Sequence, residues 1–313
     1  MCFMLFVLPA HSAPQWKPAG PITIVVGYAA GGGADVSART VADKMSQHLG
    51  VPVKIDNKPG GAATLAHRLV KAAEPNGLTL ALTSPSPMGS GPIFESDAGY
   101  TVDDFQAVGT IYALPRAMFT GPALPRSNYA AVVAELKKSP KKYSAGGSIN
   151  GVEQIMTESL NKIEGVDVNY AGYRGGAPAL VDFLGGHTHM MFDLLPSMGS
   201  HIRTGAANIM AVSWPTRLPE HPNVPTWSEL GYPAEFSTGQ WYGLIAPKGT
   251  PAATIDALNA ALRHATNDPE VAQKIKSMGA HVRADTPAEM QKQITQEHAR
   301  YQSIAKQLNI SAK

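Results

Sequence analysis

The chain has 313 residues, of which 44% are hydrophobic and 16% are charged, and its formal net charge is +2. This length is sufficient for two domains with separate hydrophobic cores. The small net charge leaves no large basic face, so we expect a small ligand and no nucleic acid as partner.

The chain begins with a short apolar run followed by small residues, MCFMLFVLPAHSAPQW. This order is typical of a secretory signal, and Ala10 and Ser12 suit cleavage before Ala13. No Lys or Arg precedes the apolar run, so residues 1–12 are interpreted as a signal peptide that is either complete or truncated. A buried strand is the alternative. Because the only cysteine is Cys2, we expect no disulfide, zinc cluster or thiol catalysis in the exported chain.

From residue 22 onward the sequence alternates between strand and helix patterns. We predict strands over 22–28, 51–57 and 78–84, with helices over 34–49 and 62–73 between them. This βαβαβ order predicts a mainly parallel sheet.

The same alternation restarts after a Pro-, Gly- and Ser-rich stretch, SPSPMGSGP, and a connecting segment. The second unit is predicted to contain strands over 141–147, 166–172, 187–193 and 208–214, with helices that include 152–163 and 177–184. The last 60 or so residues, from Thr250 onward, are predicted to be helical and to pack on the first unit. The chain therefore carries two α/β units.

The glycines of AAGGGAD resemble a nucleotide-binding turn, but the pattern is incomplete. After Gly31 and Gly33 the third glycine of a dinucleotide fingerprint is replaced by Val36, and no Gly-Lys-Ser/Thr of a P-loop follows. Neither Ser90 nor Ser148 lies in a Gly-x-Ser-x-Gly motif, so no serine nucleophile is indicated. We expect no cofactor and no enzyme activity, although a site assembled from distant residues stays open as an alternative.

A metal site is a second alternative that the sequence does not favour. His187 and His189 alternate along a predicted strand and Asp193 follows them, but no further Glu or Cys completes a ligand set. We interpret the two histidines as solvated residues and expect no metal.

Two glycine turns, AAGGGAD and SAGGSIN, each connect a strand to a helix. The first amides of a helix have no partner within the helix and lie at its positive end, so they stabilise a carboxylate without a basic side chain. Glycine lets the ligand approach the backbone closely. A cleft between the turns would therefore suit a small acid. Alternatively, both are ordinary turns, with Asp35 and Ser148 as helix caps.

Longer motifs give the turns their context. In the first unit they are AAGGGAD, NKPGGAATLA and EPNGLTLALTS, and in the second YSAGGSINGVEQ and YRGGAPALVDFLGGHTHMMFD; PEHPNVPTWSELGY and QWYGLIAPKGTP follow. This set, spread over nearly the whole chain, resembles the substrate-binding receptors of tripartite tricarboxylate transporters, the Bug proteins.

The resemblance implies an α/β periplasmic binding protein of type II, in which two lobes close on a ligand in the cleft between them. It implies that residues 13–117 plus 237–313 form one lobe and residues 118–236 the other. It also implies a monomeric periplasmic receptor that delivers a small organic carboxylate to membrane transporter subunits or to a sensor protein.

The resemblance further implies which positions bind the ligand, chiefly through backbone amides and ordered water. Arg174 could pair with a second carboxylate or be a surface residue, and Asp193 could meet an amine or hydroxyl or cap the next helix. Ala30 replaces the usual proline, and Gly147 and Ser148 replace a serine-rich sequence, which predicts a ligand that differs beyond its carboxylate. The implied ligand-binding residues are Tyr28, Ala30, Gly31, Gly32, Ala34, Asp35, Thr83, Ser84, Ala145, Gly146, Gly147, Ser148, Tyr173, Arg174 and Asp193.

Overall fold

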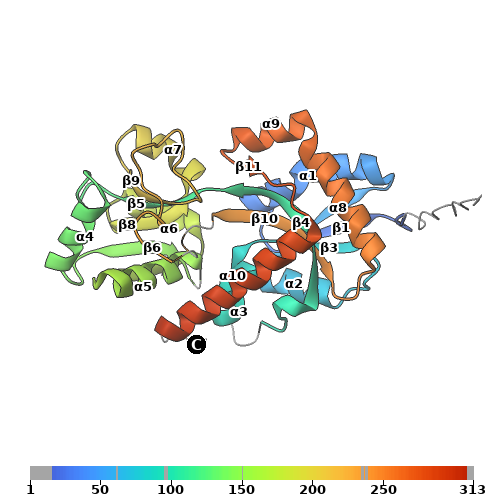
Figure 1. Ribbon diagram of the computed structural model, residues 1–313, viewed down its shortest axis with the longest axis horizontal. Coiled ribbons are helices and arrows are strands. Elements are labelled where there is room, and N and C mark those ends of the chain that lie inside the picture. Colours follow the sequence, from blue (N-terminus) through green and yellow to red (C-terminus); the bar gives the residue numbers. More distant parts are fainter. Residues whose placement is uncertain are drawn as a thin grey trace, which may run out of the picture.

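Two β-sheets, each with helices on both faces, form the two lobes of the computed structural model (Figure 1). The structure describes residues 16–60, 63–94, 98–149, 151–233, 236 and 239–308. The predicted signal peptide lies outside these residues. No helix in the described part of the chain is long and apolar enough to cross a membrane.

The first lobe is built on a six-stranded sheet with the order β11-β4-β10-β3-β1-β2. Strands β1, β2 and β3 pair in parallel, as the βαβαβ pattern predicts, whereas β4, β10 and β11 pair antiparallel. The elements of this lobe are β1 (Ile22–Val26), α1 (Gly33–Leu49), β2 (Val53–Asn57), α2 (Thr64–Lys71), β3 (Thr79–Thr83), η2 (Ser86–Ser90), α3 (Gly91–Phe94), η3 (Val102–Asp104), β4 (Phe105–Leu114), β10 (Gln240–Pro247), α8 (Ala252–Asn267), α9 (Pro269–Ser277), β11 (His281–Val282) and α10 (Pro287–Leu308).

The alternation of side chains along the strands builds a core on each side of this sheet. Ile22 and Ile24 of β1 pack with α1 and α8 on one face. Val25 points to the opposite face, where it packs with α2 and with Met290 of α10. Successive strand residues face opposite sides of a sheet, so an apolar strand such as β1 requires helices on both sides.

The second lobe has a five-stranded sheet with the order β7-β6-β8-β5-β9. Strand β6 pairs in parallel with β7 and β8, and β5 pairs antiparallel with β8 and β9. Its elements are β5 (Arg116–Thr120), α4 (Tyr129–Lys138), β6 (Ser144–Ser148), α5 (Val152–Glu164), β7 (Asn169–Tyr173), α6 (Gly176–Leu184), β8 (Met190–Leu194), α7 (Leu195–Arg203) and β9 (Asn208–Ser213).

Two segments connect the lobes (Figure 1). Strand β4 of the first sheet continues into β5 of the second with only Pro115 between them, and the chain returns after β9 to enter β10 at Gln240. The predicted lobe boundaries at 117/118 and 236/237 stay a prediction. Residue 237 lies outside the described residues.

The C-terminal helix α10 contacts both lobes, although the sequence predicts packing on the first unit alone. Met290 and Ile294 belong to a core of the first lobe, whereas Tyr301 and Ile304 belong to a core of the second. The helix also packs on η2, within the stretch that the sequence suggests is a connection. Gly89 of η2 allows this approach, because an added Cβ would lie 2.4 Å from the Tyr301 ring.

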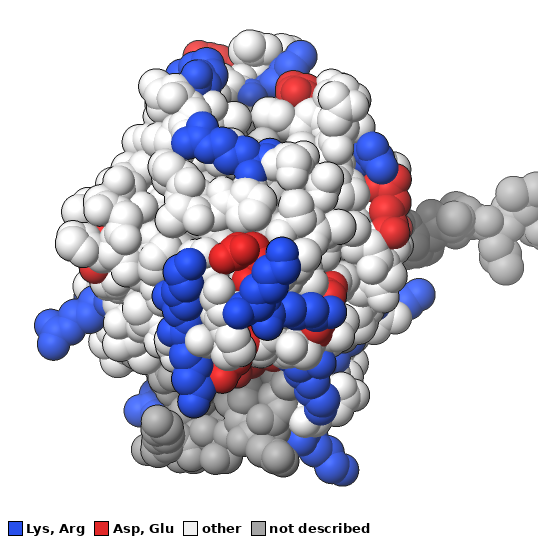
Figure 2. Space-filling view, turned by 90° about the vertical axis from the view of Figure 1, so that its left-hand side faces the viewer, with Lys and Arg blue, Asp and Glu red and all other residues white. Residues whose placement is uncertain are grey.

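The surface at the end of the second lobe carries charges of both signs, and Figure 2 shows basic and acidic side chains beside one another there. Lys137 lies 4.0 Å from Glu164, and Lys141 lies 3.9 Å from Asp167. The lysines of this end are therefore partly compensated by neighbouring carboxylates.

Candidate functional site

The carboxyl ends of the parallel strands in each lobe carry most of the residues that the sequence singles out. In the first lobe β1 and β3 pair side by side, and Tyr28 and Ser84 follow their ends. Burial raises the pKa of Tyr28, and the neighbouring Ser84 side chain partly offsets this effect. In the second lobe β6 pairs with β7 in a register that places Ser148 opposite Tyr173. Parallel α/β sheets bind ligands at this edge.

The first glycine turn is exposed, and helix α1 begins within it. Gly31 has a φ of +82°, which favours glycine, and Gly32 caps α1 without a side-chain hydrogen bond. The first bond of the helix runs from Val36 N to Gly32 O. Among the described residues, the amides of Gly33 and Ala34 have no hydrogen-bond partner. They are therefore available to an anion at the positive end of the helix.

Asp35 supports this turn from inside the lobe. Its carboxylate accepts hydrogen bonds from Arg39 Nε at 2.9 Å, Gly31 N at 2.9 Å and Asn57 Nδ2 at 3.0 Å. These bonds, first of all that from Arg39, lower the pKa of Asp35 to about 2. The side chain is buried, so it holds the shape of the turn while its ligand contact stays a prediction.

Thr83 and His67 form a second buried contact behind the turn. Thr83 Oγ1 lies 3.0 Å from His67 Nε2, and His67 Nδ1 lies 2.9 Å from the carbonyl oxygen of Ala63. Burial lowers the pKa of His67 to about 4. The Thr83 side chain is thus directed into the lobe.

Tyrosine hydroxyls connect the first turn to the junction of the lobes. The Ser37 and Tyr112 hydroxyls are hydrogen-bonded at 2.5 Å, and the Tyr112 and Tyr242 rings meet edge to face. A Cβ added at Gly33 would lie 3.6 Å from the Tyr242 hydroxyl, so this hydroxyl lies just beneath the start of α1. Burial raises the pKa of Tyr242, which keeps it neutral.

The second glycine sequence lies deeper than expected, because β6 extends through it. Ala145 and Gly146 are paired with β7 on one side and β8 on the other, and both are buried. The exposed part of the turn begins at Ser148 and Ile149. Helix α5 follows, and Gly151 caps it without a side-chain hydrogen bond.

Glu153, in the first turn of α5, packs against this second turn. A Cβ added at Gly147 would lie 2.6 Å from Glu153 Cβ, and one at Gly151 would lie 2.2 Å from Glu153 Oε2. The carboxylate therefore lies at the start of the helix, which is the position that favours an anion.

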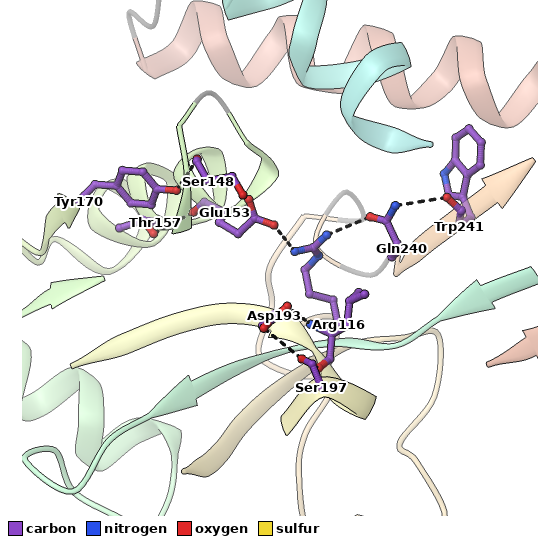
Figure 3. Close-up of polar contacts among 10 residues, drawn as sticks. Arg116, Ser148, Glu153, Thr157, Tyr170, Asp193, Ser197, Gln240 and Trp241 are labelled. Atoms are coloured by element: carbon purple, nitrogen blue, oxygen red, sulfur yellow. Dashed lines mark hydrogen bonds and ion pairs between the residues drawn. The ribbon is translucent and has the colours of Figure 1, made fainter. Parts of the chain in front are cut away.

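Arg116 lies where the two segments that connect the lobes meet, and together with Glu153 and Gln240 it forms what we call the floor of the candidate site (Figure 3). Its Nη1 donates to Glu153 Oε1 at 2.5 Å, and its Nη2 donates to Gln240 Oε1 at 3.1 Å. Arg116 begins β5 and Gln240 begins β10, so the two connections between the lobes meet at this guanidinium. Arg116, Glu153 and Gln240 were not among the residues predicted from the sequence. A lone arginine in the apolar run YALPRAMFT was the available signal.

The remaining predicted residues of the second lobe lie at or just beyond the ends of β7 and β8. Asp193 accepts hydrogen bonds from Leu194 N at 2.7 Å and Ser197 Oγ at 3.0 Å, and burial raises its pKa. Tyr173 donates to Asp182 Oδ2 at 2.7 Å. Arg174 is exposed and forms no hydrogen bond or ion pair with the described residues.

Within the described residues, no three His, Cys, Asp or Glu side chains gather in a way that could hold a metal ion. His189 contacts Ser144 at the start of β6, whereas Asp193 lies at the far end of β8. A cavity of about 630 Å³ between the lobes is lined by Pro115, Pro196 and Gly279 and contains no residue of the glycine turns.

Known proteins resemble this chain over most of its length. Residues 37–310 match the tripartite tricarboxylate transporter family receptor. Protein BugT of Bordetella pertussis is 30% identical over 299 residues, which cover 95% of this chain and 91% of BugT.

Solved structures share the arrangement of both lobes. One described as a periplasmic transporter is 35% identical, with a TM-score of 0.81 over 94% of this chain and 99% of its own. Rpa4515 of R. palustris, solved with adipate, is 27% identical, with a TM-score of 0.81 over 95% of this chain and 99% of its own. These likenesses confirm the predicted fold class of a two-lobed α/β periplasmic binding protein.

Proposed function

The chain belongs to the receptors of the tripartite tricarboxylate transporter family, and from this membership we propose that it binds a small organic carboxylate in the periplasm. It delivers this ligand to membrane transporter subunits or to a sensor protein, and it acts as a monomer. The ligand lies in a cleft between the two lobes. The adipate held by Rpa4515 is an acid of the proposed class.

The observation that carries this proposal is the pair of glycine turns, one in each lobe, at the carboxyl ends of parallel strands. Each turn starts a helix whose cap uses no side chain. Arg116 joins Glu153 of the second lobe to Gln240 at the start of β10 in the first, which supports a position of the two turns on either side of one cleft. Gly33 and Ala34 are the best placed donors of the first lobe.

The affinity of the receptor sets the number of donors that the carboxylate needs, of which Gly33 N and Ala34 N supply two. A charge-assisted hydrogen bond contributes about 1.5 to 3 kcal/mol, and micromolar binding requires about 8 kcal/mol. Three to five such bonds to one carboxylate therefore suffice if the lobes close on it. Arg174, exposed beside β7, is a further cation that can approach the ligand.

We propose binding without covalent chemistry. The two acids near the floor already have partners: Glu153 pairs with Arg116, and Asp193 accepts bonds from Leu194 and Ser197. The serine beside Asp193 is Ser197, in the first turn of α7, and its hydroxyl also lies 2.7 Å from the carbonyl oxygen of Leu194. The test is to incubate the purified protein with an acid that it binds and to examine the recovered acid by mass spectrometry. A chemically altered acid would contradict this part of the proposal.

Ligand-induced stabilisation tests the proposal directly. Thermal unfolding is measured with a panel of mono-, di- and tricarboxylates, aromatic acids and amino acids. A ligand at 100 times its dissociation constant is expected to add about 2.7 kcal/mol to the free energy of unfolding. Stabilisation by a nucleotide, with no effect of any acid at millimolar concentration, would exclude the proposed function.

A further inference from the structure

Arg116 is the only Lys or Arg among the buried residues that the structure describes, with 6% of its surface exposed. A buried guanidinium beside a ligand cleft is the group that would pair with a second carboxylate of a dicarboxylic acid. Each of its terminal nitrogens already donates one hydrogen bond, Nη1 to Glu153 and Nη2 to Gln240. The occupant of Nη1 is itself a carboxylate from this chain.

Glu153 occupies two anion-binding positions at once. It neutralises Arg116, and it lies at the start of α5, against the turn formed by Gly147 and Gly151. An acid in the first turn of a helix receives the stabilisation that the amides there would otherwise give to a bound anion. A ligand carboxylate in this part of the cleft must therefore compete with Glu153 for Arg116 and for the amides at the start of α5.

Asp193 adds a second negative charge to the same floor. Its charge acts on Arg116, as does that of Glu153. The formal charges of Arg116, Glu153 and Asp193 sum to one excess negative charge. On the first-lobe side, the side chains of Tyr28, Ser84 and Tyr242 are uncharged.

We propose that Glu153 determines the ligand class of this receptor by excluding a second carboxylate from the cleft floor. The ligand carries one carboxylate, bound by the first glycine turn, and a neutral or cationic distal end that faces Glu153 and Asp193. This inference rests on the proposed function, which requires only that some carboxylate binds.

The test compares acids of equal length that differ only in the charge at the distal end. One series is hexanoate, 6-aminohexanoate and adipate, and the other is butyrate, 4-aminobutyrate and succinate. Dissociation constants are measured by isothermal titration calorimetry at neutral pH. In at least one series the wild-type protein is expected to bind the amino acid or the monocarboxylate about tenfold or more tightly than the dicarboxylate.

Glu153→Gln keeps the size of the side chain and removes its charge, so Arg116 becomes free to take a second carboxylate. The ratio of dicarboxylate to amino-acid affinity is expected to rise about tenfold or more in this variant. Glu153→Asp, which keeps the charge, should retain the wild-type preference. Asp167→Asn is the matched control, because Asp167 is an exposed acid before β7, at the opposite end of the strand from the cleft.

Folding of each variant is checked by circular dichroism. If Glu153→Gln does not fold, Asp193→Asn removes the other negative charge from the floor and should shift the ratio in the same direction. A dicarboxylate that binds the wild-type protein as tightly as its matched amino acid, with no shift in the variant, would overturn the inference but leave the receptor function intact. If no acid in either series or the wider panel binds, the proposed function itself fails.

Discussion

Asp35 holds the first glycine turn through a hydrogen bond from the turn's own backbone, at Gly31 N. In Asp35→Asn the charge is lost and the bonds from Arg39 and Asn57 are weakened. Arg39 is half exposed, so its contribution is screened, and we expect a loss of about 1 to 3 kcal/mol in the free energy of unfolding at pH 7. Urea denaturation of both proteins measures this difference.

The pH dependence of this difference has a defined sign. The pKa of Asp35 is about 2 in the folded protein and near 3.8 when unfolded, so its stabilisation is complete above pH 4 and is lost as the pH falls toward 2. The difference in unfolding free energy between the wild-type protein and Asp35→Asn should therefore become smaller as the pH falls from 4 to 2. A gap that stays constant from pH 7 to pH 2 would show that the carboxylate charge does not contribute.

His67 gives a separate pH dependence at higher pH. Its pKa is about 4 when folded and near 6.5 when unfolded, so the unfolded chain binds more protons between these values and stability falls as the pH is lowered through them. The difference of about 2.5 pKa units corresponds to about 3 kcal/mol. In His67→Gln the free energy of unfolding, measured by urea denaturation, should therefore change less between pH 7 and pH 4 than it does in the wild-type protein. Equal pH slopes in the two proteins would contradict this assignment.

The sequence predicts where the strand ends and glycine turns lie better than it predicts what each side chain contacts. The strand-turn-helix pattern correctly places Tyr28 and Ser84 at neighbouring strand ends. It does not reveal that Asp35 and Thr83 point into the lobe, because their partners lie elsewhere in the chain. Arg116 meets its partners only after the two crossings between the lobes have formed, and no local pattern contains that contact.

Strand β6 and helix α5 meet so closely that glycine is needed between them. A Cβ at Gly147 would lie 2.5 Å from the Tyr170 hydroxyl and 2.6 Å from Glu153 Cβ. Gly147→Ala should displace Glu153 and thereby Arg116, at a cost of about 1 to 3 kcal/mol in unfolding free energy, and should weaken ligand binding. Gly20→Ala is the control, because no atom lies within 4 Å of its added Cβ. Equal thermal stability of the two variants would refute the packing argument.

The helices and strands that show a regular hydrophobic period are predicted well from the sequence. The strands that connect the two lobes are not. The parallel strands and helices of both units match the alternating pattern, and α1 matches its predicted range within one residue. Strands β4, β5 and β10 are absent from the pattern-based prediction because they are almost wholly buried and show no alternation. They pair antiparallel, so each sheet is less parallel than predicted.

Helix α10 belongs to the cores of both lobes, and Figure 1 shows it lying along one side of the molecule from the first lobe to the second. Its first half packs through Met290 and its second half through Ile304, and Lys162 Nζ of α5 donates to the carbonyl oxygen of Gln307. A helix packed in this way couples the stability of one lobe to that of the other. Its amphipathic pattern predicts a buried face but cannot specify that two different cores share it.

Ile304→Ala tests this coupling, because Ile304 reaches the second lobe from a helix that begins on the first. Removing a buried isoleucine side chain of this kind costs about 2 to 4 kcal/mol, and the side chain here is 7% exposed. We expect this loss in urea denaturation. Gln302→Ala, at an exposed position two residues earlier in the same helix, should change stability by less than about 0.5 kcal/mol. If the two variants were equally stable, the second half of α10 would not be part of the second lobe's core, and the lobes would be joined by their two crossing segments alone.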